Sequence, residues 1–282
     1  MDKKKAADLN RAKIVIWCGS AANQKALICK VSKQFNIVGI VVEKRVLKVK
    51  KNFNYYYHKI IDKLLYYPID VAWNNLQKKY AEIYEIPSTT PLLKTDNINT
   101  DNVYNFTQNL EPNIIMVSGT SLIKEKLLSL KPSIGIINLH TGLSPYIKGG
   151  PNCTNWCLAT NQFHLIGNTI MWIDSGIDSG QIISSKLVEF TGEENLNEIH
   201  WKVMESAHQL YIDCLFDLEK KGGKSNRILQ SEIGKGKLYL TKMWCAAEKK
   251  KLLKNIEGDK FKKTMRSEDY KKKQKEIICV KL

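Results

Sequence analysis

Lys13-Ile14-Val15-Ile16-Trp17-Cys18-Gly19-Ser20 is the stretch that points to the fold, because it is an apolar run of strand length that ends in a Gly-Ser turn. An amphipathic stretch at 22–35 follows, and Ile37-Val38-Gly39-Ile40-Val41-Val42 is a second run, rich in β-branched residues. A strand, a helix and a buried strand in this order are typical of a βαβ unit, in which a crossover helix joins two parallel strands. The sequence therefore predicts an α/β fold.

The alternation continues along the chain, apart from one interruption. Further elements are predicted at 113–117 (strand), 122–130 (helix), 135–140 (strand), 152–160 (helix), 168–173 (strand), 181–188 (strand) and 196–221 (helix). In the interruption, apolar side chains recur at helical spacing on either side of Pro68, and a proline ends one helix and permits another. We expect a sheet domain over 1–190 that carries a helical insert at about 52–85.

Residues 191–282 are expected to form a smaller C-terminal α+β part. The long helix is followed by apolar runs at 228–233 and 238–239 on either side of a Gly-Lys-Gly turn, which predict a small β element. A helix at 246–256 and a basic tail complete this part.

Composition excludes several classes of protein. With 282 residues, 43% of them hydrophobic, the chain is long and apolar enough to bury a core. It has no stretch of about 20 apolar residues that would span a membrane, and its first residues lack the apolar segment of a secretory signal. The seven cysteines lie mostly in apolar runs and are expected to be reduced. We expect a cytoplasmic protein without a membrane partner.

The charge is strongly asymmetric, with 44 Lys and Arg against 28 Asp and Glu and a formal net charge of +16. Half of the excess lies at 249–282, where 13 basic residues accompany 5 acidic ones, and smaller basic groups lie at 3–5 and between 44 and 51. Basic proteins often bind polyanions, but a run of lysines is more often the solvated face of a helix or tail. We therefore favour a solvated surface over a nucleic-acid partner.

Polar residues follow the predicted strands at their carboxyl ends, where ligands collect in an open α/β sheet. Gly19-Ser20 and Gly119-Thr120 lie at two such points, and Asn138 and His140 lie at a third. Because strand side chains alternate, Asn138 and His140 project from the same face. The loop Asp174-Ser175-Gly176-Ile177-Asp178, which ends 38 residues after His140, brings carboxylates that can orient the imidazole.

Other chemistries fit the spacing less well. The Asp loop lacks the ligands of a calcium-binding loop, because Gly176 and Ser185 occupy the third and twelfth positions counted from Asp174. No Gly-x-Ser-x-Gly elbow surrounds Ser144 or Ser179. Cys153 and Cys157 lack the signatures of a thiol enzyme and the second ligand pair of a zinc site, so we expect no metal.

Three segments, in this order and spacing, resemble the folate-dependent formyltransferases: Asn138-Leu139-His140, then Gly142-Leu143-Ser144-Pro145-Tyr146 with Lys148-Gly149, and then Asp174 to Ile183. That family includes glycinamide ribonucleotide, methionyl-tRNA and nucleotide-sugar N-formyltransferases. The resemblance covers about 13–190 and implies a Rossmann-like sheet domain with helices on both faces. It also implies transfer of a formyl group from N10-formyltetrahydrofolate to an amine.

The resemblance assigns an expected role to each site residue. Catalysis is expected from Asn138, His140 and Asp178. Main-chain groups of two loops are expected to hold the folate, at Leu122, Ile123, Lys124, Ile173, Asp174 and Gly176. The acceptor is expected near Gly19, Ser20, Asn23, Tyr146 and Lys148. The residue types also fit the chemistry, because His140 can act as base and then as acid, Asn138 can donate to an oxyanion, and Asp178 can orient His140.

The expected acceptor is the amino group of a nucleoside-diphosphate-linked deoxyamino sugar, as used in surface polysaccharides such as lipopolysaccharide. Methionyl-tRNA enzymes add a C-terminal five-stranded barrel, which the 60 residues after Gly222 do not suggest, whereas nucleotide-sugar enzymes carry a small C-terminal β part. Methionyl-tRNA or another small amine is the alternative, and a non-catalytic RNA-binding protein on the same fold is a hypothesis of another class. Sugar formyltransferases are commonly dimeric, and 228–239 is the segment expected at such an interface.

Overall fold

The computed structural model describes residues 11–45 and 53–282, apart from the side chains of residues 53–55, 57 and 58. The basic group at 3–5 and the lysines at 48, 50 and 51 lie outside the described residues.

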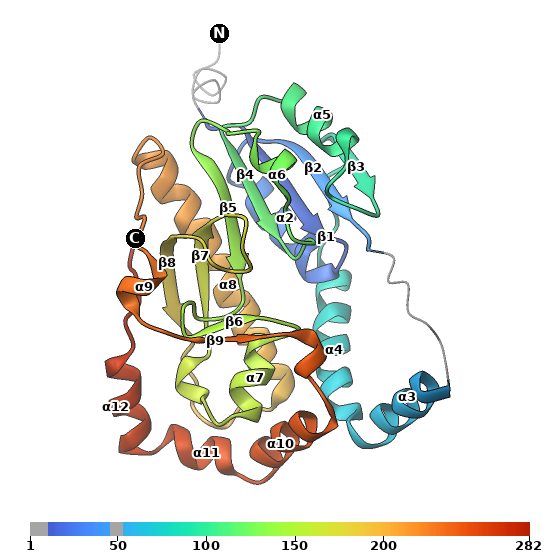
Figure 1. The fold of residues 1–282 in the computed structure, drawn as a ribbon, viewed down its shortest axis with the longest axis vertical. Helices are drawn as coiled ribbons and strands as arrows, with labels where there is room; N and C mark the ends of the chain where they lie inside the picture. The colour runs from blue at the N-terminus through green and yellow to red at the C-terminus, as the bar shows by residue number, and fades with distance from the viewer. Residues whose placement is uncertain (1–10, 46–52) are drawn as a thin grey trace.

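A seven-stranded sheet forms the centre of the molecule (Figure 1). In spatial order its strands are β3 (Leu92–Thr95), β2 (Ile37–Glu43), β1 (Ile14–Gly19), β4 (Ile114–Ser118), β5 (Gly135–His140), β7 (Gly167–Trp172) and β8 (Ile182–Leu187). The first five are parallel, and β7 and β8 are antiparallel to their neighbours. The predicted α/β fold and its first βαβ unit are confirmed, whereas the short edge strand β3 was not predicted.

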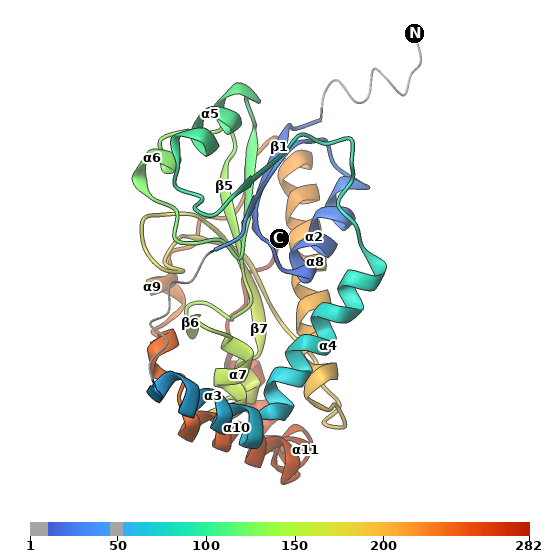
Figure 2. The ribbon, with the colours of Figure 1, turned by 90° about the vertical axis from the view of Figure 1, so that its right-hand side faces the viewer.

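Helices cover both faces of the sheet (Figure 2). The helices α2 (Ala22–Ser32) and α8 (Leu196–Lys220) cover one face, and α5 (Asp101–Asn109) and α6 (Glu125–Leu128) cover the other. The N-terminus of α8 has a capping box, in which Asn195 and Glu198 each accept the other's backbone N–H. Helix α6 is shorter than the predicted 122–130, because the residues before it form a loop that lines the site described below.

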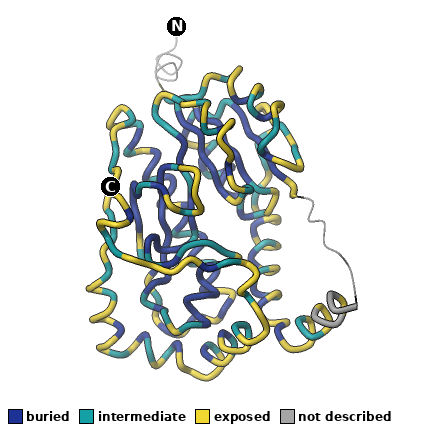
Figure 3. Tube along the Cα trace, in the orientation of Figure 1, coloured by how far each residue is buried: buried dark blue, intermediate teal, exposed yellow. Residues whose placement is uncertain are grey.

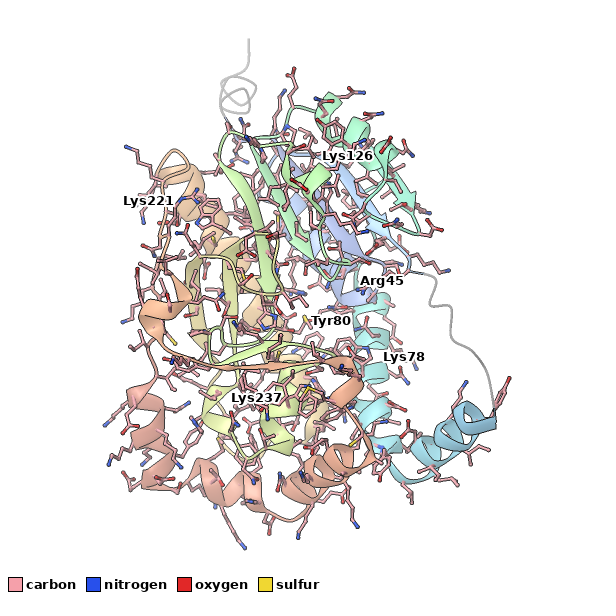
Figure 4. The ribbon with its side chains drawn as sticks, viewed as in Figure 1. Arg45, Lys78, Tyr80, Lys126, Lys221 and Lys237 are labelled. Carbon is pink, nitrogen blue, oxygen red and sulfur yellow. The ribbon has the colours of Figure 1, made fainter. Side chains whose placement is uncertain are left out.

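The insert consists of two helices, α3 (Phe53–Leu65) and α4 (Tyr67–Ile83), on either side of the break that the sequence predicts. Pro68 lies in the first turn of α4, where its missing N–H costs no helical hydrogen bond. Helix α4 packs against α2 and α8, with Tyr80 buried on its inner side and Lys78 exposed on its outer side (Figure 4). The insert therefore extends the helical layer on this side of the sheet.

The β element of the C-terminal part differs from its prediction. Strand β9 (Lys237–Tyr239) pairs with β6 (Ile147–Gly149) in a separate two-stranded sheet. Most of the segment 228–233, predicted as a strand, forms the short helix α9 (Gln230–Ile233), and Ile228 alone makes a bridge, to Ile182 of β8. The chain end occupies the same edge, because the Ser185 N–H donates to the Val280 carbonyl oxygen at 2.8 Å.

The remaining elements are short helices. They are α7 (Cys153–Ala159), the 3-10 turns Phe163–Leu165 and Thr241–Met243, and then α10 (Ala246–Glu257), α11 (Lys260–Met265) and α12 (Glu268–Glu276). The basic C-terminal region, predicted as a solvated helix or tail, is helical, and Figure 3 shows that much of its surface is exposed. Among the described helices, none is long and apolar enough to cross a membrane.

One buried hydroxyl joins the long helix α8 to the sheet. The Tyr211 hydroxyl accepts the Val117 N–H at 3.0 Å and lies 2.8 Å from the Ile137 carbonyl oxygen, to which it can donate. Val117 and Ile137 belong to the neighbouring strands β4 and β5, near the ends that carry the polar residues. Tyr211 therefore satisfies backbone groups where the sheet meets the site.

Replacing Tyr211 with phenylalanine is expected to lower the free energy of unfolding by about 1–3 kcal/mol, because the buried Val117 N–H loses its acceptor. Urea unfolding measures the change. Tyr67→Phe, at an exposed position, is the matched control and should change the free energy by less than about 0.5 kcal/mol. Equal free energies of unfolding for the wild type and Tyr211→Phe would contradict a stabilising role for the Tyr211 hydroxyl.

Candidate functional site

A cleft of about 780 Å³ opens at the carboxyl ends of β1, β4 and β5, where the strand-end rule predicts a site. Most of the site residues predicted from the sequence line this cleft: Gly19, Ser20, Asn23, Leu122, Ile123, Asn138, His140, Ile173, Asp174, Gly176 and Asp178. The predicted residues Lys124, Tyr146 and Lys148 are not among its lining residues.

A largely buried ion pair lies in the cleft. His140 Nδ1 is 3.4 Å from Asp178 Oδ2, and the two side chains are 8% and 15% exposed. His140 is the last residue of β5, and Asp178 lies on the loop between β7 and β8. Asp178 has a φ of 48°, in the left-handed region that Asp adopts more readily than most residues. The end of β5 and the loop after β7 therefore bring two opposite charges together.

The protonation of His140 follows from its two neighbours. Nε2 lies 3.2 Å from the Ile147 carbonyl oxygen, which only accepts, so Nε2 carries a proton. Nδ1 faces the Asp178 carboxylate and carries a proton as well. Burial lowers the pKa of His140, but the Asp178 charge, with contributions from Cys153 and the Ile147 carbonyl, outweighs burial and raises the pKa to about 9. His140 is therefore an imidazolium at neutral pH.

Cys153 lies beside this histidine, with its Sγ 3.5 Å from His140 Nε2. Burial raises the pKa of the Cys153 thiol in spite of the nearby imidazole, and burial also raises that of Cys157. The thiolate is the nucleophilic form of cysteine, and these shifts disfavour it at neutral pH. Neither cysteine is among the residues lining the cleft. The geometry thus adds to the sequence argument against a thiol enzyme.

Strand β6 and the C-terminal part together hold Asp178 in place. The Gly149 N–H donates to Asp178 Oδ2 at 2.9 Å, and Gln230 Nε2 donates to the Asp178 carbonyl oxygen at 2.8 Å. Gly149 ends β6 with a φ of 88°, and a Cβ at this position would clash with the carbonyl oxygen of Tyr239 on β9. Glycine is therefore required where β6 passes between β9 and the carboxylate.

A second polar network holds the loop between β4 and α6. The buried side chain of Glu43, at the end of β2, accepts the Ser121 N–H at 2.6 Å. Asn99 donates to the Leu122 carbonyl oxygen at 2.9 Å and accepts the Lys124 N–H at 2.8 Å. Lys124 is consequently held at the start of α6, and the side chains of Glu43 and Asn99 fix the backbone of a loop that lines the cleft.

Two residues expected to contact the acceptor have structural partners elsewhere. The Tyr146 hydroxyl accepts the Ile278 N–H at 3.1 Å, which ties the end of the chain to the segment before β6. Lys148 lies on β6, opposite Leu238 of β9. Both residues therefore lie at the junction of the two-stranded sheet with the C-terminal part.

Asn23 lines the cleft, but its polar atoms are engaged by the insert. Gln77 of α4 accepts the Asn23 N–H at 3.2 Å and donates to Asn23 Oδ1 at 3.1 Å. Asn23 Nδ2 lies 3.5 Å from Met204 Sδ of α8. Met204 and Trp73 of α4 also line this end of the cleft. Asn23 thus joins α2 to the insert, and the insert contributes to the cleft wall.

Several lining residues were missed in the sequence. Glu43 ends β2 and Arg45 follows it, so both could have been found by extending the strand-end rule to that strand. Arg45 is the one lysine or arginine among the described lining residues, and it donates to the Gly119 carbonyl oxygen at 2.9 Å (Figure 4). Trp73 and Met204 carry no such signal, because apolar residues at helical spacing resemble core. The described residues hold no cluster of three or more His, Cys, Asp or Glu that could bind a metal ion.

Comparison with known proteins gives a consistent family. A family model described as formyl transferase matches residues 12–215. A methionyl-tRNA formyltransferase from Halothermothrix orenii is 34% identical over 142 residues, which cover 50% of this chain and 43% of that protein. This chain therefore spans less than half the length of this curated relative.

Solved structures of similar fold include formyltransferases with different substrates in their names. A sugar N-formyltransferase from a Shewanella species aligns with 86% of this chain and 87% of its own, with a TM-score of 0.55 and 13% identity. A phosphoribosylglycinamide formyltransferase from Bacillus halodurans aligns with 74% of this chain and 96% of its own, with a TM-score of 0.51 and 19% identity. At these identities the likeness shows the fold alone.

We expect His140 to titrate near pH 9 in an NMR titration, and Asp178→Asn to lower its pKa, because burial then acts without the opposing charge. The folded pKa lies above the ordinary value of 6.5, so the ion pair adds stability fully below pH 6.5 and loses it as the pH rises through 9. The gap in unfolding free energy between wild type and variant should therefore narrow across that range. His164, whose pKa should be the same in both proteins, is the internal control. If the pKa of His140 is unchanged in Asp178→Asn, the charge of Asp178 is not what raises it.

Proposed function

Because the chain belongs to the formyl transferase family, we propose that it transfers a formyl group from N10-formyltetrahydrofolate to a primary amine. The observation that carries the proposal is the meeting of Asn138, His140 and Asp178 in one cleft, as an amide donor, a cation and a carboxylate. Attack of an amine on a formamide-like carbon requires a proton acceptor, a donor to the oxyanion and an acid for the leaving nitrogen. The three side chains supply these functions.

The protonation state of the pair supports one order of events. Asp178 accepts the proton that the amine loses as its nitrogen bonds to the formyl carbon. Asn138 donates its amide hydrogen to the oxyanion, and the His140 imidazolium stabilises the same charge. When the bond from the carbon to N10 breaks, His140 gives its proton to N10 and regains one from Asp178. This order differs from the sequence-based expectation that His140 acts first as a base, because a pKa of about 9 leaves it protonated at the start.

Two loops are suited to hold the folate. Leu122, on the loop fixed by Glu43 and Asn99, is 51% exposed, and Ile177, on the loop that carries Asp178, is 45% exposed. Both residues line the cleft. Exposed apolar side chains on two loops that line one cleft favour binding of a flat ring system such as a pterin.

For the acceptor we propose a nucleoside-diphosphate-linked amino sugar. The cleft continues from the ion pair to Trp73 and Met204, and to Tyr239 and Thr241 on the C-terminal part, so it has room for a ligand larger than a simple amine. A nucleotide-linked sugar suits a cleft of this extent.

Methionyl-tRNA is the second candidate, because a curated relative is named a methionyl-tRNA formyltransferase. The matched region, however, covers 43% of that relative. A non-catalytic RNA-binding protein is the candidate of another class, supported by the basic composition alone.

Turnover with N10-formyltetrahydrofolate against a panel of nucleotide-linked amino sugars, methionyl-tRNA and simple amines tests the proposal. We expect a sugar nucleotide to be formylated, with tetrahydrofolate and the formamide formed in equal amounts. If the protein binds the folate but formylates only methionyl-tRNA, then methionyl-tRNA replaces the sugar nucleotide as the acceptor. Absence of folate binding, together with RNA binding that weakens steeply as salt rises, would overturn the enzyme proposal.

Asn138→Ala is expected to lower kcat by a factor of about 10² to 10³, the usual effect of losing one oxyanion donor. KM should change much less, because the lost interaction forms mainly in the transition state. Asn105→Ala, at an exposed position on α5, is the matched control. Near-normal turnover in Asn138→Ala would remove this residue from the proposed role.

A further inference from the structure

An exposed apolar stripe lies on α3, far along the insert from the cleft wall. Ile60 and Leu64 are 58% and 74% exposed, Tyr56 is 51% exposed, and Tyr67, just beyond the helix, is 57% exposed. Positions 56, 60 and 64 are four residues apart, so these side chains lie on one side of the helix. Large apolar side chains gathered in this way commonly mark a contact surface.

The other side of α3 joins the body of the protein. Ile61 packs against the apolar cluster that includes residues of α7, α10 and α11, and Asp62 forms an ion pair of 2.7 Å with Lys249 of α10. Asp62 is the one carboxylate in the sequence of α3, and this ion pair directs it toward α10. The helix therefore carries two lysines, at 59 and 63, and no other acidic residue beside the apolar stripe.

The end of the molecule that carries the stripe is rich in basic residues. Helices α3, α10, α11 and α12 lie together at the lower end of the molecule in Figure 1, and we call this surface the basal face. Their sequences contain 13 lysines and 6 acidic residues. Several of the lysines lie in ion pairs, and one of these pairs joins Lys262 to Glu193, which lies outside the four helices. When Glu193 is counted as well, an excess of six positive charges remains.

From this combination we propose that the basal face binds the surface of an anionic lipid bilayer, with α3 lying in the plane of the headgroups. In this position Ile60 and Leu64 enter the boundary between headgroups and acyl chains, as the apolar side of an interfacial helix does. Tyr67 suits the headgroup level, because its ring is apolar and its hydroxyl is polar. The lysines of the four helices attract anionic headgroups, so burial and charge act together.

Charge complementarity favours this occupant over two others. A second copy of the chain would bring two basal faces of the same net charge together, and like charges oppose such an interface. A nucleic acid would neutralise the lysines but would leave the apolar stripe in water, because its outer surface consists of phosphates. An anionic bilayer satisfies both the lysines and the stripe. The proposal departs from the sequence-based expectation of no membrane partner.

Vesicle flotation with the full chain tests the proposal. The probes are unilamellar vesicles of phosphatidylcholine alone and of phosphatidylcholine mixed with phosphatidylglycerol, at low and high salt. We expect flotation with the anionic vesicles, weaker at high salt, and a partition coefficient lowered at least about tenfold by Ile60→Ser with Leu64→Ser. Leu92→Ser, at a 41% exposed leucine on β3, is the matched control and should float like wild type.

Each alternative has its own result. Circular dichroism and thermal unfolding should be the same for wild type and the double variant, since both substituted side chains are exposed. If the double variant floats as well as the wild type does, the apolar stripe does not contribute to membrane binding and the proposal is wrong. Failure of the wild type to float overturns the proposal. If the wild type is then a dimer in solution and the double variant is a monomer, the face belongs to an interface with a second copy. RNA binding without vesicle binding would overturn it in favour of a polyanion.

Discussion

A carboxylate that is only 15% exposed needs partners, and the need to satisfy Asp178 organises the centre of this protein. Its Oδ2 atom receives the Gly149 N–H at 2.9 Å and lies 3.4 Å from His140 Nδ1. Leaving such a group without its charge partner would be strongly destabilising, so the three chain segments that meet there depend on one another. Strand β5 supplies the imidazole, β6 supplies the N–H, and the loop after β7 supplies the carboxylate.

This dependence extends into the C-terminal part. Strand β6 is held by β9, whose Tyr239 carbonyl oxygen accepts the Gly150 N–H at 2.9 Å, and Gln230 holds the backbone of the Asp178 loop. The sequence predicts residues 191–282 as a separate part, yet these contacts set the geometry of a residue on the sheet domain. Substitutions in the C-terminal part can therefore change the shape of the cleft wall, and they can also change the geometry of the ion pair between His140 and Asp178.

The parts of the molecule differ in how far the sequence predicts them. The strands and their alternation with helices could be predicted because apolar runs such as 14–18 and 37–42 have the length of buried strands and are separated by longer stretches of helical pattern. Asn138 and His140 could be found because strand geometry places both at one sheet edge. Glu43 and Asn99 act through backbone N–H groups distant in sequence, and Gln77 reaches Asn23 across the insert. Such pairings depend on tertiary packing, which local patterns do not contain. The strand prediction for segment 228–233 was wrong for the same reason. Its apolar pattern fits a strand, but its position depends on tertiary contacts such as the bonds from Gln230 to carbonyl groups of the Asp178 loop.

The distribution of charge separates the chemistry from the rest of the surface. Arg45 is the one lysine or arginine lining the cleft within the described residues, although the chain has a formal net charge of +16. Exposed charges are screened over about 8 Å at physiological ionic strength, so lysines of α11 and α12, which do not line the cleft, act chiefly on what approaches their own surface. A long-range steering field for an anionic substrate would require the charge to surround the cleft. The excess is instead concentrated on helices that also expose Ile60 and Leu64, and a basic surface combined with an apolar stripe selects a different kind of partner from the one that the cleft selects.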